Sequence, residues 1–269
     1  MNDIILKVEN ISYSVSKKNN LSGNHSVEIL KNISFKVESG KVLGISGQSG
    51  SGKSTLAKIL AGVYKQTSGK IQKNFRKDCD KSLPDPVQIL FQNDGELINP
   101  FRKVKDVLNE AFELKYNKNK DYSLEIDKII KQFHLNPHLK ESKGSQLSSG
   151  EKQRIALARI VIVEPEILVL DEPFSSQDIE AQLDVLKLIK SITTELDLTI
   201  ICISHDLKIL KQFADDLIIM FDGKIVESGS SESLISNPQN EYIKFLLSAQ
   251  ELNLTKEEIK TFHNNYEQN

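Results

Sequence analysis

A run of nine residues near position 50 has the residue types and spacing of a phosphate-binding loop. Gly47, Gly52, Lys53 and Ser54 fill the fixed positions of the pattern G-x-x-x-x-G-K-[ST]. In such a loop the glycines let backbone N–H groups approach an anion, the lysine neutralises β- and γ-phosphate charge, and the serine hydroxyl binds Mg²⁺. The sequence therefore predicts a nucleoside triphosphate site. The residues expected to contact the nucleotide are Gly47, Gln48, Ser49, Gly50, Ser51, Gly52, Lys53, Ser54 and Thr55.

The segments on either side of this loop match the structure that it requires. Residues 41–46 are typical of a short strand, and residues 55–61 of a helix that ends at Gly62. Strand, glycine loop and helix together aim backbone N–H groups and the positive end of a helix at a phosphate. A chance match in a flexible glycine and serine loop is the alternative, and this context argues against it.

An acidic pair follows an unbroken apolar run. Residues 167–170 predict a buried parallel strand, and Asp171 and Glu172 come directly after it. Ligands of open α/β sheets bind at this edge. We expect Asp171 to orient Mg²⁺, through water, and Glu172 to polarise the attacking water. An acidic pair after a strand is often only the start of a loop, but the upstream phosphate loop favours the catalytic role.

Two further polar residues end strands at the same predicted edge. His205 follows the strand predicted at 198–203, and we expect it to contact the γ-phosphate. A lone histidine is more often structural or on the surface. Gln92 follows the strand predicted at 87–91 and could contact the metal or the water. The alternative for Gln92 is a polar strand terminus.

A helix start at position 148 allows a structural and a functional interpretation. Ser148 and Glu151 have the spacing of a capping box, which satisfies backbone N–H groups in the first turn. The same helix N-terminus could present N–H groups and the Ser148 hydroxyl to a phosphate. Both can hold in different states. The residues concerned are Ser148, Ser149, Gly150 and Glu151.

Composition excludes several classes of function. Lys plus Arg number 35 against 37 Asp plus Glu, so no basic field points to nucleic acid as a partner. Only Cys79 and Cys202 are present, far apart, which indicates no disulfide framework and no cysteine metal site. No apolar run approaches ~18 residues, the length that spans a bilayer. We expect a cytoplasmic chain that reaches a membrane only through partner proteins.

The order of patterns along the chain predicts an α/β fold. Residues 4–38 suggest a small antiparallel sheet, with a polar loop at 17–26. From about 100 to 160 the period is helical, with one apolar stripe at Val104, Val107, Leu108, Ala111 and Phe112 and another at Leu124, Ile126, Ile129, Ile130 and Phe133. Residues 217–227 predict a hairpin that turns at Asp222-Gly223.

This ordered set of motifs resembles the ATP-binding cassette (ABC) family over nearly the whole chain. The loop at 47–55 resembles its Walker A, Gln92 its Q-loop, residues 147–151 its signature motif, 167–172 its Walker B, 175–178 its D-loop and His205 its switch histidine. Tyr13 lies where the family places an aromatic ring against adenine; the alternative is an ordinary strand tyrosine. The resemblance implies a P-loop NTPase cassette at 1–250, with an antiparallel β subdomain and an inserted helical subdomain at about 94–160, followed by a tail at 251–269.

The resemblance also implies a head-to-tail pair of cassettes with ATP sandwiched between them. Residues 147–151 would then serve the ATP of the other subunit. Three positions depart from the family pattern: Ser149 replaces a glycine, Glu151 replaces a glutamine, and Gln177 replaces a leucine. We hypothesise an asymmetric heterodimer, in which the site built on this chain's Walker motifs is competent and the site completed by its signature is slower.

Two segments resemble the ATPases of peptide and nickel importers. These are residues 89–100, which end in Asn99-Pro100, and residues 237–249, which contain Asn237-Pro238 and Tyr242. The resemblance implies two permease subunits, docked near residues 92–102, an extracytoplasmic substrate-binding protein, and a place on the cytoplasmic face of the membrane. Peptides, nickel and metal–metallophore complexes remain open as substrates. Alternatives are a soluble ABC ATPase without a transport role and a non-catalytic nucleotide sensor.

Overall fold

The structure is a computed structural model that describes residues 3–19, 23–75, 84–91, 97–116, 120–174 and 179–250. Its main sheet has the strand order β5-β6-β7-β3-β8-β9. The first five of these strands are parallel, and β9 pairs antiparallel with β8 at one edge. The strands are β3 (Val42–Gly47), β5 (Val87–Leu90), β6 (Ile167–Asp171), β7 (Thr199–Ile203), β8 (Asp216–Phe221) and β9 (Lys224–Ser230).

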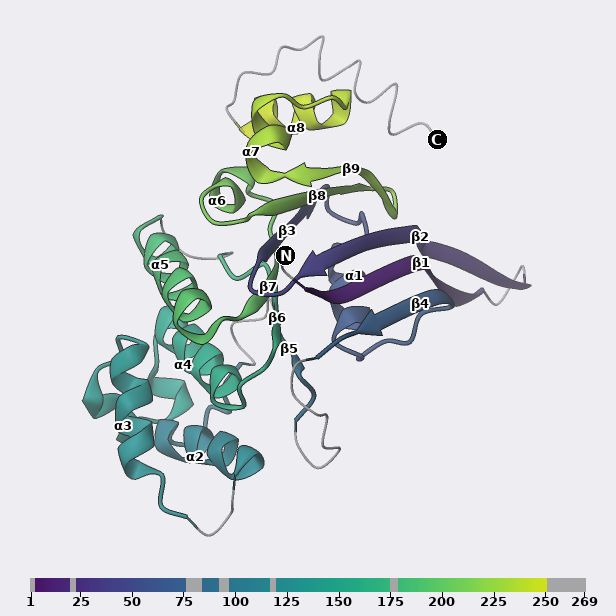
Figure 1. Cartoon of the computed structure of the whole chain (residues 1–269). Helices are drawn as coiled ribbons and strands as arrows, with labels where there is room; N and C mark the ends of the chain where they lie inside the picture. The colour runs from purple at the N-terminus through teal and green to yellow at the C-terminus, as the bar shows by residue number, and fades with distance from the viewer. Residues whose placement is uncertain are drawn as a thin grey trace.

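The central strands are apolar because both faces of the sheet are covered. Every residue of β3, β6 and β7 is buried. Alternate residues of β6 enter different cores: Ile167 and Val169 pack with α1 (Lys53–Leu60), and Leu168 and Leu170 pack with helices on the other face. Figure 1 shows α1 between the main sheet and the smaller one, and α5 (Ile179–Leu196) on the opposite side.

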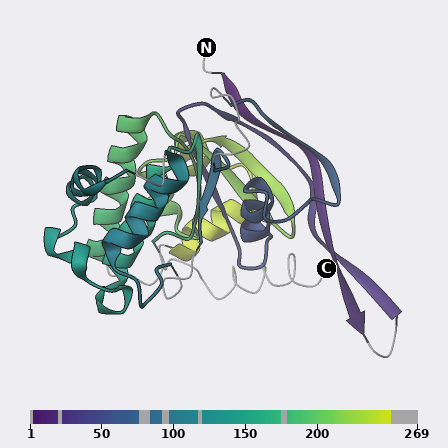
Figure 2. The same ribbon diagram turned by 90° about the horizontal axis from the view of Figure 1, so that it is seen from below.

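The smaller sheet is antiparallel, with the order β2-β1-β4. Its strands are β1 (Ile4–Asn19), β2 (Gly23–Glu38) and β4 (Ser68–Lys73), which confirms the sheet expected from residues 4–38. The polar loop expected at 17–26 is wrong, because β1 and β2 stay paired to Asn19 and Gly23. Figure 2 shows this ribbon projecting beyond the sheet. Hydrogen bonds between the two backbones hold the ribbon together. Alternation of apolar and polar residues indicates only a strand with one buried face, so it does not reveal a strand pair whose side chains are polar.

Five helical elements lie between β5 and β6 in the chain, and we call them the helical region. They are α2 (Val104–Lys115), α3 (Ser123–Gln132), the short 3₁₀ helices η1 (Pro137–Glu141) and η2 (Gly144–Gln146), and α4 (Ser149–Ile162). The apolar stripe expected on α2 is buried throughout. On α3, Ile126 and Ile130 are buried but Leu124 is 74% exposed. Leu124 precedes Ile126 by two residues, about 200° around the helix, so it faces away from the core.

The chain end contributes a hairpin and three short helices. The turn between β8 and β9 has φ 44° at Asp222 and 74° at Gly223, which confirms the predicted two-residue turn. The helices are α6 (Leu207–Lys211), α7 (Ser231–Ser236) and α8 (Glu241–Gln250). Figure 1 places α7 and α8 beside β9. Cys202 on β7 is fully buried, as expected for a small apolar residue.

Candidate active site

The loop at 47–52 joins the end of β3 to the start of α1. Gly47 has φ 144°, and a Cβ there would lie 2.0 Å from the carbonyl oxygen of Met220 on β8. Only glycine permits this approach of two backbones. Gly50 has φ 82° with no atom within 4 Å of the position a Cβ would take. A side chain at position 47 would therefore collide with β8, whereas position 50 faces open space.

The N-terminus of α1 has the features of an anion site. Its N-cap, Gly52, supplies no side-chain cap, and the first turn contains no acidic residue. By contrast, α4 is capped by Ser148 and α6 by Asp206. Backbone N–H groups in the first turn of a helix need partners, and an anion can supply them. This end of α1 is where the sequence predicts the phosphates.

Lys53 folds back onto the loop that carries it. Its Nζ donates to the carbonyl oxygens of Gly47 at 2.7 Å and Gln48 at 2.8 Å. The side chain is buried, and this burial lowers the pKa of Lys53, while the carboxylates of Glu172 and Asp171 oppose that shift. Among the described residues, the positive charge of Lys53 is compensated by the two loop carbonyls and by the carboxylates of Glu172 and Asp171. A phosphate at the loop would provide a stronger partner.

Ser54 and Asp171 come together from α1 and β6. The Ser54 hydroxyl donates to Asp171 Oδ1 at 3.0 Å, and Asp171 is 4% exposed. Burial raises the pKa of Asp171, and the hydrogen bond from Ser54 opposes this. A hydroxyl and a carboxylate side by side are the hard oxygen ligands that Mg²⁺ prefers. Among the described residues, no group of three or more His, Cys, Asp or Glu side chains is placed to hold a metal ion.

Glu172 and His205 are in direct contact at the ends of β6 and β7. His205 Nδ1 lies 2.9 Å from Glu172 Oε2. An ionised carboxylate only accepts hydrogen bonds, so Nδ1 is the donor in this pair. Glu172 has φ 53°, a left-handed conformation that is rare outside glycine, and it precedes Pro173. The Glu172 N–H donates to the carbonyl of Ile203 at 3.0 Å, which fixes this unusual turn to β7.

Three contacts that the sequence did not predict also support the site. Gln153 on α4 is buried and donates from Nε2 to the carbonyl of Pro173. Gly223, at the hairpin turn, donates to the carbonyl of Ser51 at 3.2 Å. On α8, Tyr242 accepts from the Gln48 amide. Gly223 and Tyr242 belong to segments that the sequence singled out for other reasons, and no local pattern indicates their contacts with the phosphate loop.

The helix start at Ser148 is a complete capping box. Ser148 Oγ accepts from the Glu151 N–H at 3.3 Å, and the Ser148 N–H donates to Glu151 Oε2 at 2.8 Å. The Ser148 hydroxyl also donates to Glu151 Oε2 at 2.9 Å. These residues, with Ser149 and Gly150, begin α4, whereas the phosphate loop begins α1. The two segments that are predicted to contact phosphates therefore lie on different elements.

Tyr13 lies on β1 and stacks on Tyr64, which follows α1. The two rings are nearly parallel, with centroids 5.7 Å apart and an angle of 4° between their planes. Tyr13 pairs with Leu30 on β2, and the Leu30 side chain lies against Gly52 at the start of α1. Contact of Tyr13 with adenine stays a prediction. Gln92 and the segment 175–178 lie outside the described residues.

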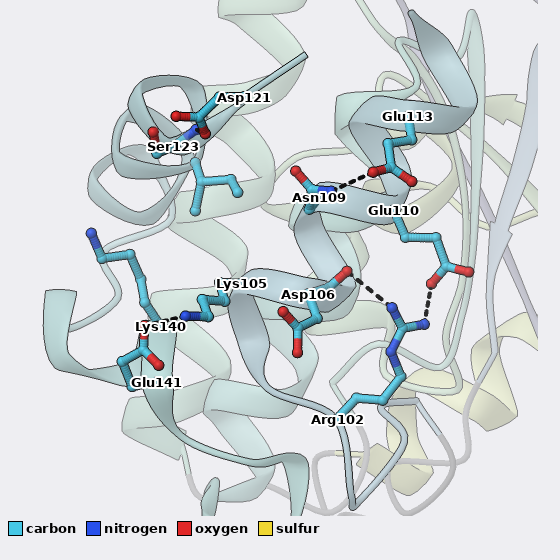
Figure 3. A pocket seen from close by; sticks show the side chains of 11 residues that line it. Arg102, Lys105, Asp106, Asn109, Glu110, Glu113, Asp121, Ser123, Lys140 and Glu141 are labelled. Atoms are coloured by element: carbon cyan, nitrogen blue, oxygen red, sulfur yellow. Dashed lines mark hydrogen bonds and ion pairs between the residues drawn. The ribbon is translucent and has the colours of Figure 1, made fainter. Parts of the chain in front are cut away.

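A cavity of about 600 Å³ lies in the helical region, as Figure 3 shows. Lys105 pairs with Glu141 at 2.7 Å, and Lys103 pairs with the same carboxylate at 2.8 Å. These two lysines hold the pKa of Glu141 at about 2. No residue of the phosphate loop lines the cavity. The lining contains more acidic side chains (Asp106, Glu110, Glu113, Asp121 and Glu141) than basic ones (Arg102, Lys105 and Lys140), so the cavity does not suit a triphosphate.

Comparison with known proteins agrees with this geometry. The model of the ABC transporter family matches residues 30–175. The di/tripeptide transport ATP-binding protein DppF of Pseudomonas aeruginosa is 35% identical over 84% of this chain and 72% of its own length. The dipeptide transport ATP-binding protein DppF of Escherichia coli is 33% identical over 87% of this chain and 72% of its own length. The chain belongs to the ABC transporter family, and it is an ATPase of that family.

A solved structure agrees at the level of the fold. The protein cbiO1 of Clostridium perfringens, described as part of the ABC transporter complex cbiONQ, superposes with a TM-score of 0.71 at 27% identity. The match covers 97% of this chain and 99% of cbiO1. The predicted α/β cassette with an antiparallel sheet is therefore confirmed. In the part of the chain that the structure describes, no helix has both the length and the apolar character needed to cross a membrane.

Proposed function

We propose that this chain is the ATP-hydrolysing subunit of a multisubunit importer for small peptides. It pairs with a second ABC ATPase subunit, in a heterodimer, and docks on two transmembrane permease subunits that receive substrate from an extracytoplasmic binding protein. It works at the cytoplasmic face of the membrane. The observation that carries the proposal is the similarity of 35% over 84% of the chain to a di/tripeptide transport ATPase. Nickel and metal–metallophore complexes are the alternative cargo.

The boundaries of the cassette follow from the same proposal. Residues 1–250 form the ATPase domain, and the helical region corresponds to the inserted subdomain at about 94–160. The tail at 251–269 lies outside the described residues. In this arrangement β5, β6 and their loops connect the nucleotide site to the inserted helices, and α4 supports the Pro173 turn through Gln153.

The residues of the phosphate loop bind and orient the triphosphate. Uncapped N–H groups of α1 and Lys53 neutralise the phosphate oxygens, and Tyr13 stacks on the adenine. Lys53 Nζ bonds the carbonyls of Gly47 and Gln48 with two of its three N–H groups, so the third can be directed at a phosphate. Ser54 and Asp171 would hold Mg²⁺, with Gln92 as a further ligand or water contact. When bound, the ion would neutralise negative charge on the phosphate oxygens.

Glu172 and His205 act on the other side of the reacting phosphate. Glu172 accepts a hydrogen bond from the attacking water, and the left-handed turn aims the carboxylate away from the strand. His205 is oriented by its Nδ1 bond to Glu172, and its Nε2 contacts the γ-phosphate. The second subunit closes over this site and excludes water, so hydrolysis depends on pairing.

The signature of this chain serves the site held mainly by the partner cassette. There the Ser148 hydroxyl is already bonded to Glu151, and the Glu151 carboxylate would lie near the phosphates. Both effects weaken a contact with the triphosphate, because the hydroxyl has a competing acceptor and the carboxylate repels an anion. We therefore infer that this composite site turns over more slowly than the one built on Lys53 and Glu172.

Replacing Glu151 with glutamine is expected to raise turnover at this composite site about three- to tenfold, and turnover of the whole complex by at most about twofold, because it removes one negative charge beside the triphosphate. The glutamine side-chain oxygen can still accept from the Ser148 N–H, so the helix start is retained. Steady-state phosphate release measures the effect. Glu195→Gln on α5 is the matched control. Unchanged turnover in Glu151→Gln would show that this charge does not limit the second site.

The contact with the permeases is proposed at the start of the helical region. Phe101 is 82% exposed and lies just before α2. Aromatic side chains are enriched at the centres of protein–protein interfaces, so we propose Phe101 as a docking contact. Phe101→Ala is expected to leave the affinity of the isolated chain for Mg-AMP-PNP unchanged and to reduce its co-purification with the permeases at least about fivefold.

Leu124→Ala provides the control for Phe101→Ala. Leu124 is 74% exposed on α3 in the same region, so it tests whether loss of any exposed apolar side chain weakens docking. We expect this variant to co-purify normally. Equal loss in both variants, or no loss in Phe101→Ala, would place the contact elsewhere.

The proposed function is tested by transport in a purified complex. Membranes that express the chain with its neighbouring subunits are solubilised, the complex is reconstituted in vesicles, and uptake of a labelled dipeptide and of Ni²⁺ is measured with ATP. Peptide uptake that requires ATP is the expected result. Uptake of Ni²⁺ alone would correct the cargo. A chain that co-purifies only with soluble partners would overturn the transport role.

A further inference from the structure

One peptide unit of the phosphate loop is held from two sides. Its carbonyl, at Gly47, accepts from Lys53 Nζ at 2.7 Å. Its amide, at Gln48, donates to the phenol oxygen of Tyr242 at 2.8 Å. The C=O and N–H of a trans peptide point in opposite directions, so Lys53 and Tyr242 lie on opposite sides of the unit. Together they fix its orientation.

Tyr242 is itself rigidly placed. It is 1% exposed on α8, and its ring contacts that of Phe221 on β8, with centroids 4.8 Å apart. Burial raises the pKa of Tyr242 to about 12, so the phenol stays neutral in ordinary assay buffers. A neutral hydroxyl held in the core offers the Gln48 amide an acceptor at a fixed position.

The start of α8 is anchored independently of the loop. Asn240 Oδ1 accepts from the Tyr242 N–H at 2.8 Å. The Glu227 carboxylate on β9 accepts from the Asn240 N–H at 2.9 Å and from the Gln239 N–H at 3.4 Å. These bonds tie α8 to the edge strand of the main sheet. The position of the Tyr242 hydroxyl is therefore set by β8 and β9.

The two bonds to the peptide unit differ in what nucleotide binding requires of them. The Lys53 ammonium has three N–H donors, and it has to share them between the loop carbonyls and the phosphates, whereas Tyr242 has no role toward the phosphates. We propose that Tyr242 is a positioning residue for the phosphate loop, which holds the Gly47–Gln48 peptide in its binding orientation while Lys53 serves the phosphates. The inference rests on the proposed triphosphate site and makes the C-terminal helix part of it.

Tyr242→Phe tests the role of the hydroxyl alone. The phenylalanine keeps the ring and its packing on Phe221, and removes the hydroxyl that accepts from the Gln48 amide. We expect the Kd of the full chain for Mg-AMP-PNP to rise about five- to tenfold, because the amide loses an acceptor at a fixed position and the loop is no longer held in its binding conformation. We expect kcat of the complex to change less than KM.

The control is Tyr116→Phe, which removes a phenol bonded to Glu164 at 3.0 Å in the helical region. We expect its Kd to stay within about twofold of wild type, since a surface hydrogen bond contributes little. Glu227→Ala, which loosens the start of α8, is expected to raise the Kd in the same direction as Tyr242→Phe.

Two outcomes separate this inference from the proposed function. A wild-type Kd in Tyr242→Phe, with or without a lower Tm, would overturn the positioning role while ATP binding by wild type stands. Absence of saturable Mg-AMP-PNP binding by the wild-type chain would instead overturn the triphosphate site itself. A raised Kd in Tyr242→Phe with an unchanged Kd in Tyr116→Phe supports the inference.

Discussion

Replacing Glu172 with glutamine lowers ATP turnover of the assembled complex by a factor on the order of a hundred or more. The neutral amide keeps the size of the side chain but is a poor base for the attacking water, and general base catalysis contributes roughly 10²–10⁴ in rate. Lys53, Ser54 and Asp171 are unchanged, so ATP still binds. The variant is therefore expected to retain ATP in a closed pair of subunits. Phosphate release and nucleotide retention after gel filtration measure the two effects.

Glu166→Gln is the matched control for Glu172→Gln. Glu166 precedes β6, at the end of the strand opposite Glu172, so the same chemical change is made on the same strand away from the phosphates. We expect near-normal turnover in this variant. Wild-type hydrolysis in Glu172→Gln within the complex would refute the assignment of Glu172 as the base. Turnover in a complex with the equivalent substitution in the second cassette then reports the asymmetry of the two sites.

Replacing Lys53 with methionine abolishes productive binding of ATP. Two effects combine: the triphosphate loses the ammonium that neutralises its β- and γ-oxygens, and the carbonyls of Gly47 and Gln48 lose their donor. Loss of a positioned charge at a phosphoryl transfer site costs several kcal/mol, so we expect turnover to fall more than about a hundredfold. The Kd for Mg-AMP-PNP and the rate of phosphate release measure binding and hydrolysis separately.

Lys58→Met is the control for Lys53→Met. Lys58 lies on the same helix, one turn and a half further on, and its Nζ is 5.4 Å from the ring of Tyr64. It carries the same charge change without a bond to the loop. We expect its nucleotide affinity to stay close to wild type. If Lys53→Met keeps full turnover, the residues at 47–55 are not the site of hydrolysis.

The residues that carry chemistry were predictable because they follow local patterns. The spacing of Gly47, Gly52, Lys53 and Ser54 is a short motif, and Asp171, Glu172 and His205 each end a strand with a strong apolar signal. Parallel strands bring their carboxyl ends to one edge, so contact between Glu172 and His205, 33 residues apart, follows from topology. The turn at Asp222-Gly223 was predictable because positive φ angles favour those residue types.

The supporting contacts were not predictable, because nothing local encodes them. Tyr242 is 194 residues from Gln48, and its sequence context is that of an ordinary amphipathic helix. The bonds from Lys53 to the carbonyls of its own loop were not predictable either, because the motif records only residue types and their spacing. The paired ribbon at 17–26 has polar composition, and its strands are held by backbone bonds that no side-chain pattern reveals.

The most direct test is a structure of the Glu172→Gln chain with Mg-ATP. We predict a triphosphate against the N–H groups of residues 50–55, with Lys53 Nζ bonded to phosphate oxygens. The Tyr242 hydroxyl should still accept from the Gln48 amide. A triphosphate bound elsewhere, or bound ATP without a bond from Lys53 Nζ to a phosphate oxygen, would contradict the account.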